Sequence, residues 1–289
     1  MPGTDGFHRE KTDSAQPQAR SGFPFLLVAV AGFAAIVIVA LVVRSARLAQ
    51  APREIPSKPE TSNPAALAEI RAISEEARKA SLDGDDEKAI RLTAETAKKL
   101  EAVAASSTGA EKAVMEYAAA LAAEQNQILK KYIDAAGAFA DAGGTSYTGL
   151  TDAQSVQARQ SLLETATSSH EAVIDYFRGI SARIPKDLAA RGVSRKDADE
   201  FAAGFNAKAN PENLLGIHQL EHQILLASKQ QFEVLEVNAD RWSVTSEGEL
   251  SFSDEFPKDA REEIARLRRQ IESLASQQES LIEARKASR

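Results

Sequence analysis

The stretch EKAVMEYAAALAAEQNQILKKYIDAAGAF, residues 111–139, decides the fold class of this chain. Its inward-facing positions recur at alternating spacings of three and four, which is the period of one face of an α-helix. This face comprises Val114, Ala118, Leu121, Gln125, Ile128, Tyr132 and Phe139, and it is widened by Met115, Ala122, Leu129 and Ala136. Because so wide a face needs neighbours on several sides, we expect this helix at the centre of a bundle.

Strong helix formers continue on both sides of this segment. No proline occurs between Pro64 and Pro185, and Ala, Leu, Glu, Lys and Gln dominate the interval. Helix starts are predicted at capping signals, namely Asn63-Pro64, Asp85-Asp86, Thr108-x-x-Glu111, Thr151-x-x-Gln154, Ser194 and Asn210-Pro211. We expect Pro185 to end the helix that starts at Thr151, because proline disrupts a helix interior.

One segment near the C-terminus has the period of a strand. Apolar and polar residues alternate over residues 242–252, around a turn signal at Glu247-Gly248, which predicts a β-hairpin. The fold class is therefore all-α, and we expect residues 64–289 to form an antiparallel helical bundle with this small hairpin before the terminal helix.

The terminal amphipathic helix, residues 257–287, carries a heptad pattern. Its candidate interaction surface is the seam Ile264, Leu267, Ile271, Leu274 and Leu281. Such a seam is typical of a coiled coil, which would make the chain a homodimer. Ala275, Ile282 and Ala284 broaden the apolar face, and this width favours docking of the helix inside its own bundle.

The N-terminal part of the chain differs in composition from the rest. Residues 23–43, FPFLLVAVAGFAAIVIVALVV, carry no charged, amide or hydroxyl side chain. At about 1.5 Å per residue they span roughly 31 Å, the thickness of a bilayer core, which predicts a single transmembrane helix from Phe23 to Val43. Residues 1–22 have the composition of a disordered tail, and the proline-containing residues 44–63 that of a semi-rigid stalk.

A cleaved signal peptide is the alternative for this apolar run, because Ala49-Gln50-Ala51 is a small-x-small site. The run exceeds the length of a signal h-region, and Pro52 would follow the cut, so both features favour a retained signal-anchor. The numbers of basic residues on the two sides of the span are nearly equal, so the positive-inside rule does not decide the orientation. The absence of cysteine suits an oxidising compartment, so we expect a cytoplasmic N-terminus and a periplasmic domain.

Composition excludes some functions and favours others. The net charge is −7, and no dense basic cluster occurs, so we expect no nucleic-acid partner. The anchor, the stalk and the heptad helix together predict a non-enzymatic scaffold or assembly component that binds other proteins. An N-terminal anchor followed by Ala-rich helices and a W-x-V…G-x-L-x-F hairpin resembles bacterial envelope proteins, which implies an envelope location.

The motif with the clearest chemistry is His218-Gln219-Leu220-Glu221-His222, of the form H-x-x-E-H. On a helix the two histidines lie one turn apart and can share a zinc ion, while the glutamate acts on bound water. Peptidases with this motif have an α/β fold and a distant third ligand, whereas this chain has almost no strand signal. We therefore expect no enzymatic activity, and a tethered zinc metallopeptidase is the remote alternative.

A third histidine, His170, could join this motif in a metal site that needs no peptidase activity. If the helices that carry His170 and His218 pair antiparallel around residue 197, His170 lies near residues 222–224. We expect no cofactor, and the alternative is a divalent metal ion with His170, His218, Glu221 and His222 as its candidate ligands. The alternative function is a bundle that senses a metal, a ligand or pH and signals through a partner, and the simpler interpretation is a hydrogen-bonded polar layer.

Overall fold

The computed structural model describes residues 64–287, which are mostly helical with one small antiparallel sheet. In chain order the elements are α2 (Pro64–Leu82), α3 (Asp86–Ser106), α4 (Gly109–Asp141), α5 (Ala153–Ala190), α6 (Arg195–Ala209), α7 (Pro211–Val237), a 3₁₀ turn (Ala239–Arg241), β1 (Trp242–Val244), β2 (Leu250–Phe252) and α8 (Lys258–Ala287). The predicted tail, transmembrane helix and stalk lie outside the described residues. Within residues 64–287, no helix has the length and apolarity needed to span a bilayer.

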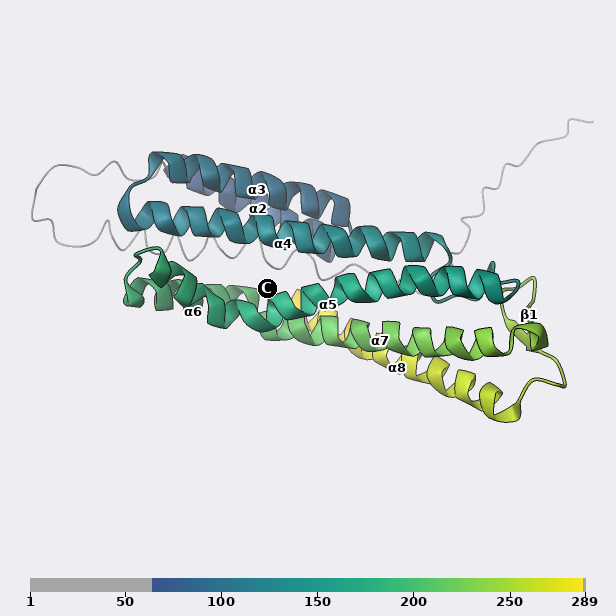
Figure 1. Ribbon diagram of the computed structural model, residues 1–289. Coiled ribbons are helices and arrows are strands. Elements are labelled where there is room, and N and C mark those ends of the chain that lie inside the picture. The colour runs from purple at the N-terminus through teal and green to yellow at the C-terminus, as the bar shows by residue number, and fades with distance from the viewer. Residues whose placement is uncertain (1–63, 288–289) are drawn as a thin grey trace, which may run out of the picture.

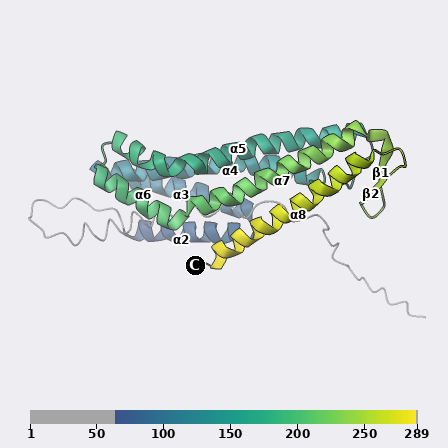
Figure 2. The ribbon, with the colours of Figure 1, turned by 90° about the horizontal axis from the view of Figure 1, so that it is seen from below.

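The helices form an elongated bundle (Figure 1). α4, α5 and α7 run along its length, α3 packs on α4 and α2 packs on α3, and α6 lies at one end. The hairpin of β1 and β2 lies at the other end, with Trp242 opposite Phe252 in antiparallel register. Figure 2 shows α7 between α5 and α8, so α8 forms an outer layer on α7. The predicted helical bundle and the hairpin over residues 242–252 are confirmed.

Two large apolar clusters fill the bundle, one toward each end. The first lies between α2, α3, α4, the C-terminal half of α5, α6 and the start of α7, and includes Met115 and Phe205. The second lies at the hairpin end and includes Phe139, Phe232 and Trp242. α4 contributes to both clusters, as expected for the wide face that its sequence carries.

Several helix starts follow the predicted capping residues. The side chain of Asp85 accepts a hydrogen bond from the backbone N–H of Lys88 at the start of α3. Ser194 caps α6 in the same way, and Asn210 caps α7 from a left-handed backbone conformation with φ of 44°. Asparagine tolerates this conformation better than other non-glycine residues, so the sharp α6–α7 corner depends on it.

Two predicted capping boxes are wrong. Thr108 precedes α4 but makes no capping hydrogen bond with its side chain. α5 is capped by Asp152 rather than Thr151, because Ser155 forms the reciprocal pair of bonds, at 2.8 Å to Asp152 Oδ1 and 3.1 Å from the Asp152 N–H. A carboxylate at this position also interacts favourably with the helix dipole, which threonine does not.

The prediction that Pro185 ends α5 is also wrong, since the helix continues to Ala190. Proline removes one helix hydrogen bond and costs about 3 kcal/mol in a helix interior. Ile184 and Leu188 on either side of it are both 0% exposed in the first apolar cluster. Burying each such side chain contributes about 1.5–3 kcal/mol, so tertiary packing offsets the local preference.

The heptad face of α8 packs against its own chain. Leu267, Ile271 and Leu274 are buried in one apolar cluster with Ile224 and Ala227 of α7. Ile264 is buried in the cluster at the hairpin end, and the half-buried Leu281 lies beside Gly216. The structure therefore shows the docked arrangement, in which α7 already covers the candidate interaction surface.

Candidate metal centre

The pairing of α5 with α7 brings the histidines together. The helices are antiparallel, as shown by the ion pair between Glu164 and Lys229 at 2.9 Å and the hydrogen bond from Gln157 to Glu236 at 2.6 Å. This register matches the predicted pairing around residue 197. It places His170 of α5 level with the H-x-x-E-H segment of α7 in the interior of the bundle.

Three polar side chains from these two helices converge on one point. The Nε2 atom of His170 lies 3.0 Å from Nδ1 of His218 and 3.3 Å from Oε2 of Glu221. The third side of this triangle, between His218 Nδ1 and Glu221 Oε2, is 3.6 Å. The three residues are 0%, 1% and 4% exposed, so this group lies in the core rather than on the surface.

A tyrosine from α4 holds two members of the group in place. The Tyr132 hydroxyl donates a hydrogen bond of 2.6 Å to Oε1 of Glu221. Its ring stacks on the His170 ring, with 4.4 Å between the centroids. From its helical spacing alone, Tyr132 is expected only as part of an apolar face. Its residue type could have indicated the polar contact, because a buried tyrosine needs a hydrogen-bond partner for its hydroxyl.

The electrostatics of the group favour an ionised carboxylate and a neutral imidazole. Burial opposes the charge of Glu221, but hydrogen bonds from His170 and His218 outweigh it and hold the Glu221 pKa well below its usual range. Burial lowers the pKa of His218 and raises that of Tyr132, whose bond to Glu221 acts in the same direction. The carboxylate and the neutral imidazole are the forms in which these side chains bind metals.

The geometry fits a tetrahedral metal ion. Ligand atoms bound to zinc at about 2.0–2.1 Å lie about 3.3 Å from one another in a regular tetrahedron. The three separations in this group, 3.0, 3.3 and 3.6 Å, scatter around that value. One face of a zinc coordination sphere is thus present, formed by two imidazole nitrogens and one carboxylate oxygen.

His222, the fourth candidate, lies just outside this convergent set. It is half-buried, its ring centroid lies 6.0 Å from that of His170, and its Nδ1 atom is buried without a hydrogen-bond partner. In an H-x-x-E-H peptidase both motif histidines bind the metal and the glutamate is left for a water molecule. Here Glu221 takes part in the convergent set itself, so the geometry differs from that of the peptidase site.

Comparisons with known proteins do not place the chain in a family. No protein-family model, no curated protein and no solved structure matches it. The functional argument therefore depends on the chemistry of the site.

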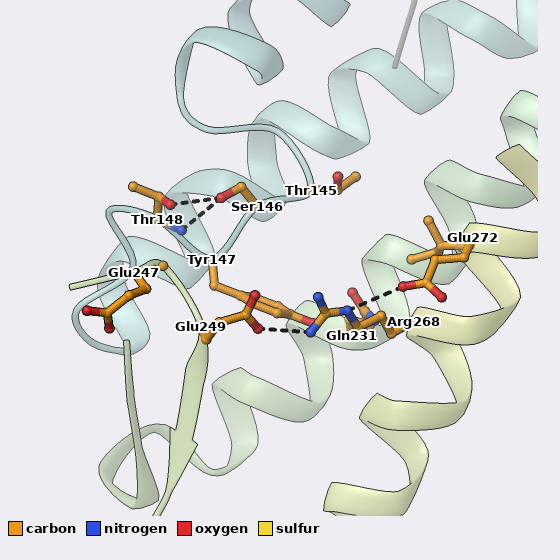
Figure 3. Close-up of a pocket in the computed structure, with 11 residues that line it drawn as sticks. Thr145, Ser146, Tyr147, Thr148, Gln231, Glu247, Glu249, Arg268 and Glu272 are labelled. Carbon is orange, nitrogen blue, oxygen red and sulfur yellow. Dashed lines mark hydrogen bonds and ion pairs between the residues drawn. The ribbon is translucent and has the colours of Figure 1, made fainter. Parts of the chain in front are cut away.

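A polar pocket of about 250 Å³ lies at the hairpin end, away from this group (Figure 3). It is lined by residues 145–148, the hairpin turn, α7 and α8. Arg268 lies in it between Glu249 and Glu272, with ion-pair distances of 3.0 and 3.5 Å. An anionic ligand would have to displace one of these carboxylates, and we assign the pocket no role.

Asp86, the first residue of α3, gives a pH-dependent prediction. It is buried, its Oδ1 atom has no hydrogen-bond partner, and burial together with the charges of Asp85 and Glu221 raises its pKa to about 7. The folded state therefore binds the Asp86 proton more tightly than the unfolded state does. Stability from this group is full below the unfolded pKa of 3.8 and is lost as the pH rises to about 7.

We expect Asp86→Asn to unfold at higher urea concentration than the wild type at pH 8, with a gain of about 1–3 kcal/mol, and with little gain at pH 4. The helix dipole favours the charge and reduces the gain below the full value of the pKa shift. Asp83→Asn is the control, because Asp83 is exposed and its charge is not among those that raise the Asp86 pKa. A gain that is the same at both pH values would contradict the assignment.

Proposed function

We propose that this chain is a membrane-tethered, non-enzymatic helical bundle that holds one divalent transition-metal ion in its core and acts as a metal-responsive scaffold for a partner protein. Zinc is the ion that fits best. The observation that carries this proposal is the convergence of His170, His218 and Glu221, with three donor atoms at the spacings of a tetrahedral ion.

A metal ion accounts for features that a plain polar layer leaves unfavourable. Glu221 is ionised and buried, and buried charges in proteins are paired or bind metals. The two imidazoles direct nitrogen atoms at the same point as the carboxylate, where only one proton fits between His170 and His218. A divalent cation there satisfies all three donors at once and compensates the carboxylate charge.

The position of the centre supports a regulatory role. Its ligands come from α5 and α7, and Tyr132 adds α4, so a bound ion would connect the three long helices of the bundle. The sequence predicts an anchor at Phe23–Val43 and a periplasmic domain of an envelope protein. A bundle on one anchor passes a signal through a partner, so we propose that metal occupancy sets the surface that the partner binds.

Peptidase activity is not part of the proposal. A catalytic glutamate needs access to water and substrate, whereas Glu221 is 4% exposed and both of its oxygens already have partners. The burial of Glu221 is instead consistent with a ligand in a structural site, which retains its metal ion.

Metal titration of the purified full-length protein in detergent tests the proposal. We expect one zinc ion per chain after removal of bound metal with a chelator and titration with Zn²⁺. His170→Ala and His218→Ala should each lower the affinity by at least about 100-fold, since even outer-shell changes cost 10–100-fold. At a free zinc concentration 100 times Kd, the wild type should gain about 2.7 kcal/mol in stability.

Gln219→Ala is the control, because Gln219 is exposed on the same turn of α7. Wild-type protein that takes up no zinc, or His218→Ala protein that binds zinc as the wild type does, would disprove the metal-binding proposal.

A further inference from the structure

We infer that His222 is the fourth ligand, so that the centre is a closed site of three histidines and one glutamate. This inference rests on the proposed function, because it names the ligand set of the same ion. It goes further in stating that the protein supplies all four ligands and leaves no position for substrate or catalytic water.

Ring separations support this assignment. Two imidazoles bound to one tetrahedral ion have ring centroids about 5 Å apart, given a Zn–N distance of about 2.0 Å and about 1.1 Å from nitrogen to ring centre. The centroids of His170 and His218 are 5.1 Å apart, which matches this geometry. Those of His170 and His222 are 6.0 Å apart, within about 1 Å of the same value. A side-chain rotation of His222 would have to close this difference, because His222 is not among the residues whose donor atoms lie within 4.8 Å of one another.

The surroundings of His222 give a second, independent argument. Its Nδ1 atom is buried and has no hydrogen-bond partner, which is unfavourable for a side chain that has the option of facing solvent. A metal ion at the neighbouring triad supplies the partner that this nitrogen lacks.

The helix geometry places His222 on the correct side of the ion. His218 and His222 are separated by one turn of α7, and Glu221 lies between them on the same face. Three ligands from a single turn and a fourth from α5 form a set that requires the α5–α7 register. Four protein ligands are typical of structural zinc sites, whereas catalytic sites keep one position open.

Cobalt substitution combined with a cysteine scan tests the fourth ligand. Co²⁺ replaces zinc in tetrahedral sites and gives visible absorption bands. The chain contains no cysteine, so a thiol introduced at one position reports that position alone. In His222→Cys protein we expect a thiolate-to-cobalt charge-transfer band in the near ultraviolet. Gln223→Cys is the matched control, exposed on the same turn, and should show no such band.

His222→Ala provides the second measurement. We expect its affinity for Co²⁺ and Zn²⁺ to fall by about 100-fold, with helix content by circular dichroism equal to that of the wild type. The inference is overturned if His222→Cys shows no more charge-transfer absorption than Gln223→Cys, or if His222→Ala keeps wild-type affinity and cobalt spectrum. In either case the wild type still binds metal, and the proposed function stands with an open fourth position. Wild-type protein that binds neither Co²⁺ nor Zn²⁺ would overturn both this inference and the proposed function.

Discussion

Replacement of Glu221 by alanine is expected to lower the free energy of unfolding of the metal-free protein by about 3–5 kcal/mol, the usual cost of removing one partner from a buried polar network. The carboxylate accepts the Tyr132 hydroxyl at 2.6 Å and lies 3.3 Å from Nε2 of His170. Alanine leaves both groups buried without these partners, in a site that water does not reach. Urea unfolding followed by circular dichroism, in the presence of a chelator, measures the change.

Two further variants separate the contributions at this site. Glu221→Gln keeps an oxygen that accepts the Tyr132 hydroxyl, so we expect it to lose clearly less stability than Glu221→Ala. Glu233→Ala, at an exposed position of the same helix, should change stability by less than about 0.5 kcal/mol. If Glu221→Ala were as stable as Glu233→Ala, the buried network would contribute nothing to folding and its description would be wrong.

Leu267→Ala is expected to destabilise the protein by about 2–5 kcal/mol, the range for deletion of a buried leucine side chain. Leu267 is 0% exposed and lies in the cluster that joins α8 to α7. α8 packs chiefly on this one helix, so few other contacts compensate for the cavity. Thermal unfolding detected by circular dichroism, and hydrogen exchange of the α8 backbone, measure the loss.

The same variant distinguishes docking within one chain from a coiled coil between two chains. If α8 docks on its own α7, the unfolding midpoint of wild type and Leu267→Ala is independent of protein concentration. A midpoint that rises with concentration in the wild type would show that α8 is shared between copies. Leu281→Ala is the control, since Leu281 is only half-buried and should cost less.

The local structure was largely predictable because it depends on short-range signals. The starts of α3, α6 and α7 follow their capping residues, and the hairpin follows its alternation and turn. The errors have two causes, tertiary packing around Pro185 and a competing local capping signal at the start of α5. α5 passes through Pro185 because the residues around it are buried, and its start moves to Asp152 because Ser155 completes the capping pair.

The candidate site was predictable in part. The H-x-x-E-H motif and an antiparallel pairing around residue 197 were enough to bring His170 near α7. They did not show that Glu221 rather than His222 completes the convergent triad, or that Tyr132 fixes both Glu221 and His170. Those outcomes depend on the rotation of each helix about its axis and on side-chain rotamers, which sequence spacing leaves open.

By itself, the sequence determined the all-α fold class, most helix boundaries and the prediction of a membrane anchor at residues 23–43, because these follow from periodicity, capping and the length of an apolar run. Tertiary structure alone decided that α7 covers the heptad face of α8, and that three donor atoms from two helices come within 4.8 Å of one another. The physical reason is the different precision in atomic position that the two kinds of feature require. Periodicity specifies which face of a helix is buried, whereas a metal site depends on differences of less than 1 Å that only the packed neighbours fix.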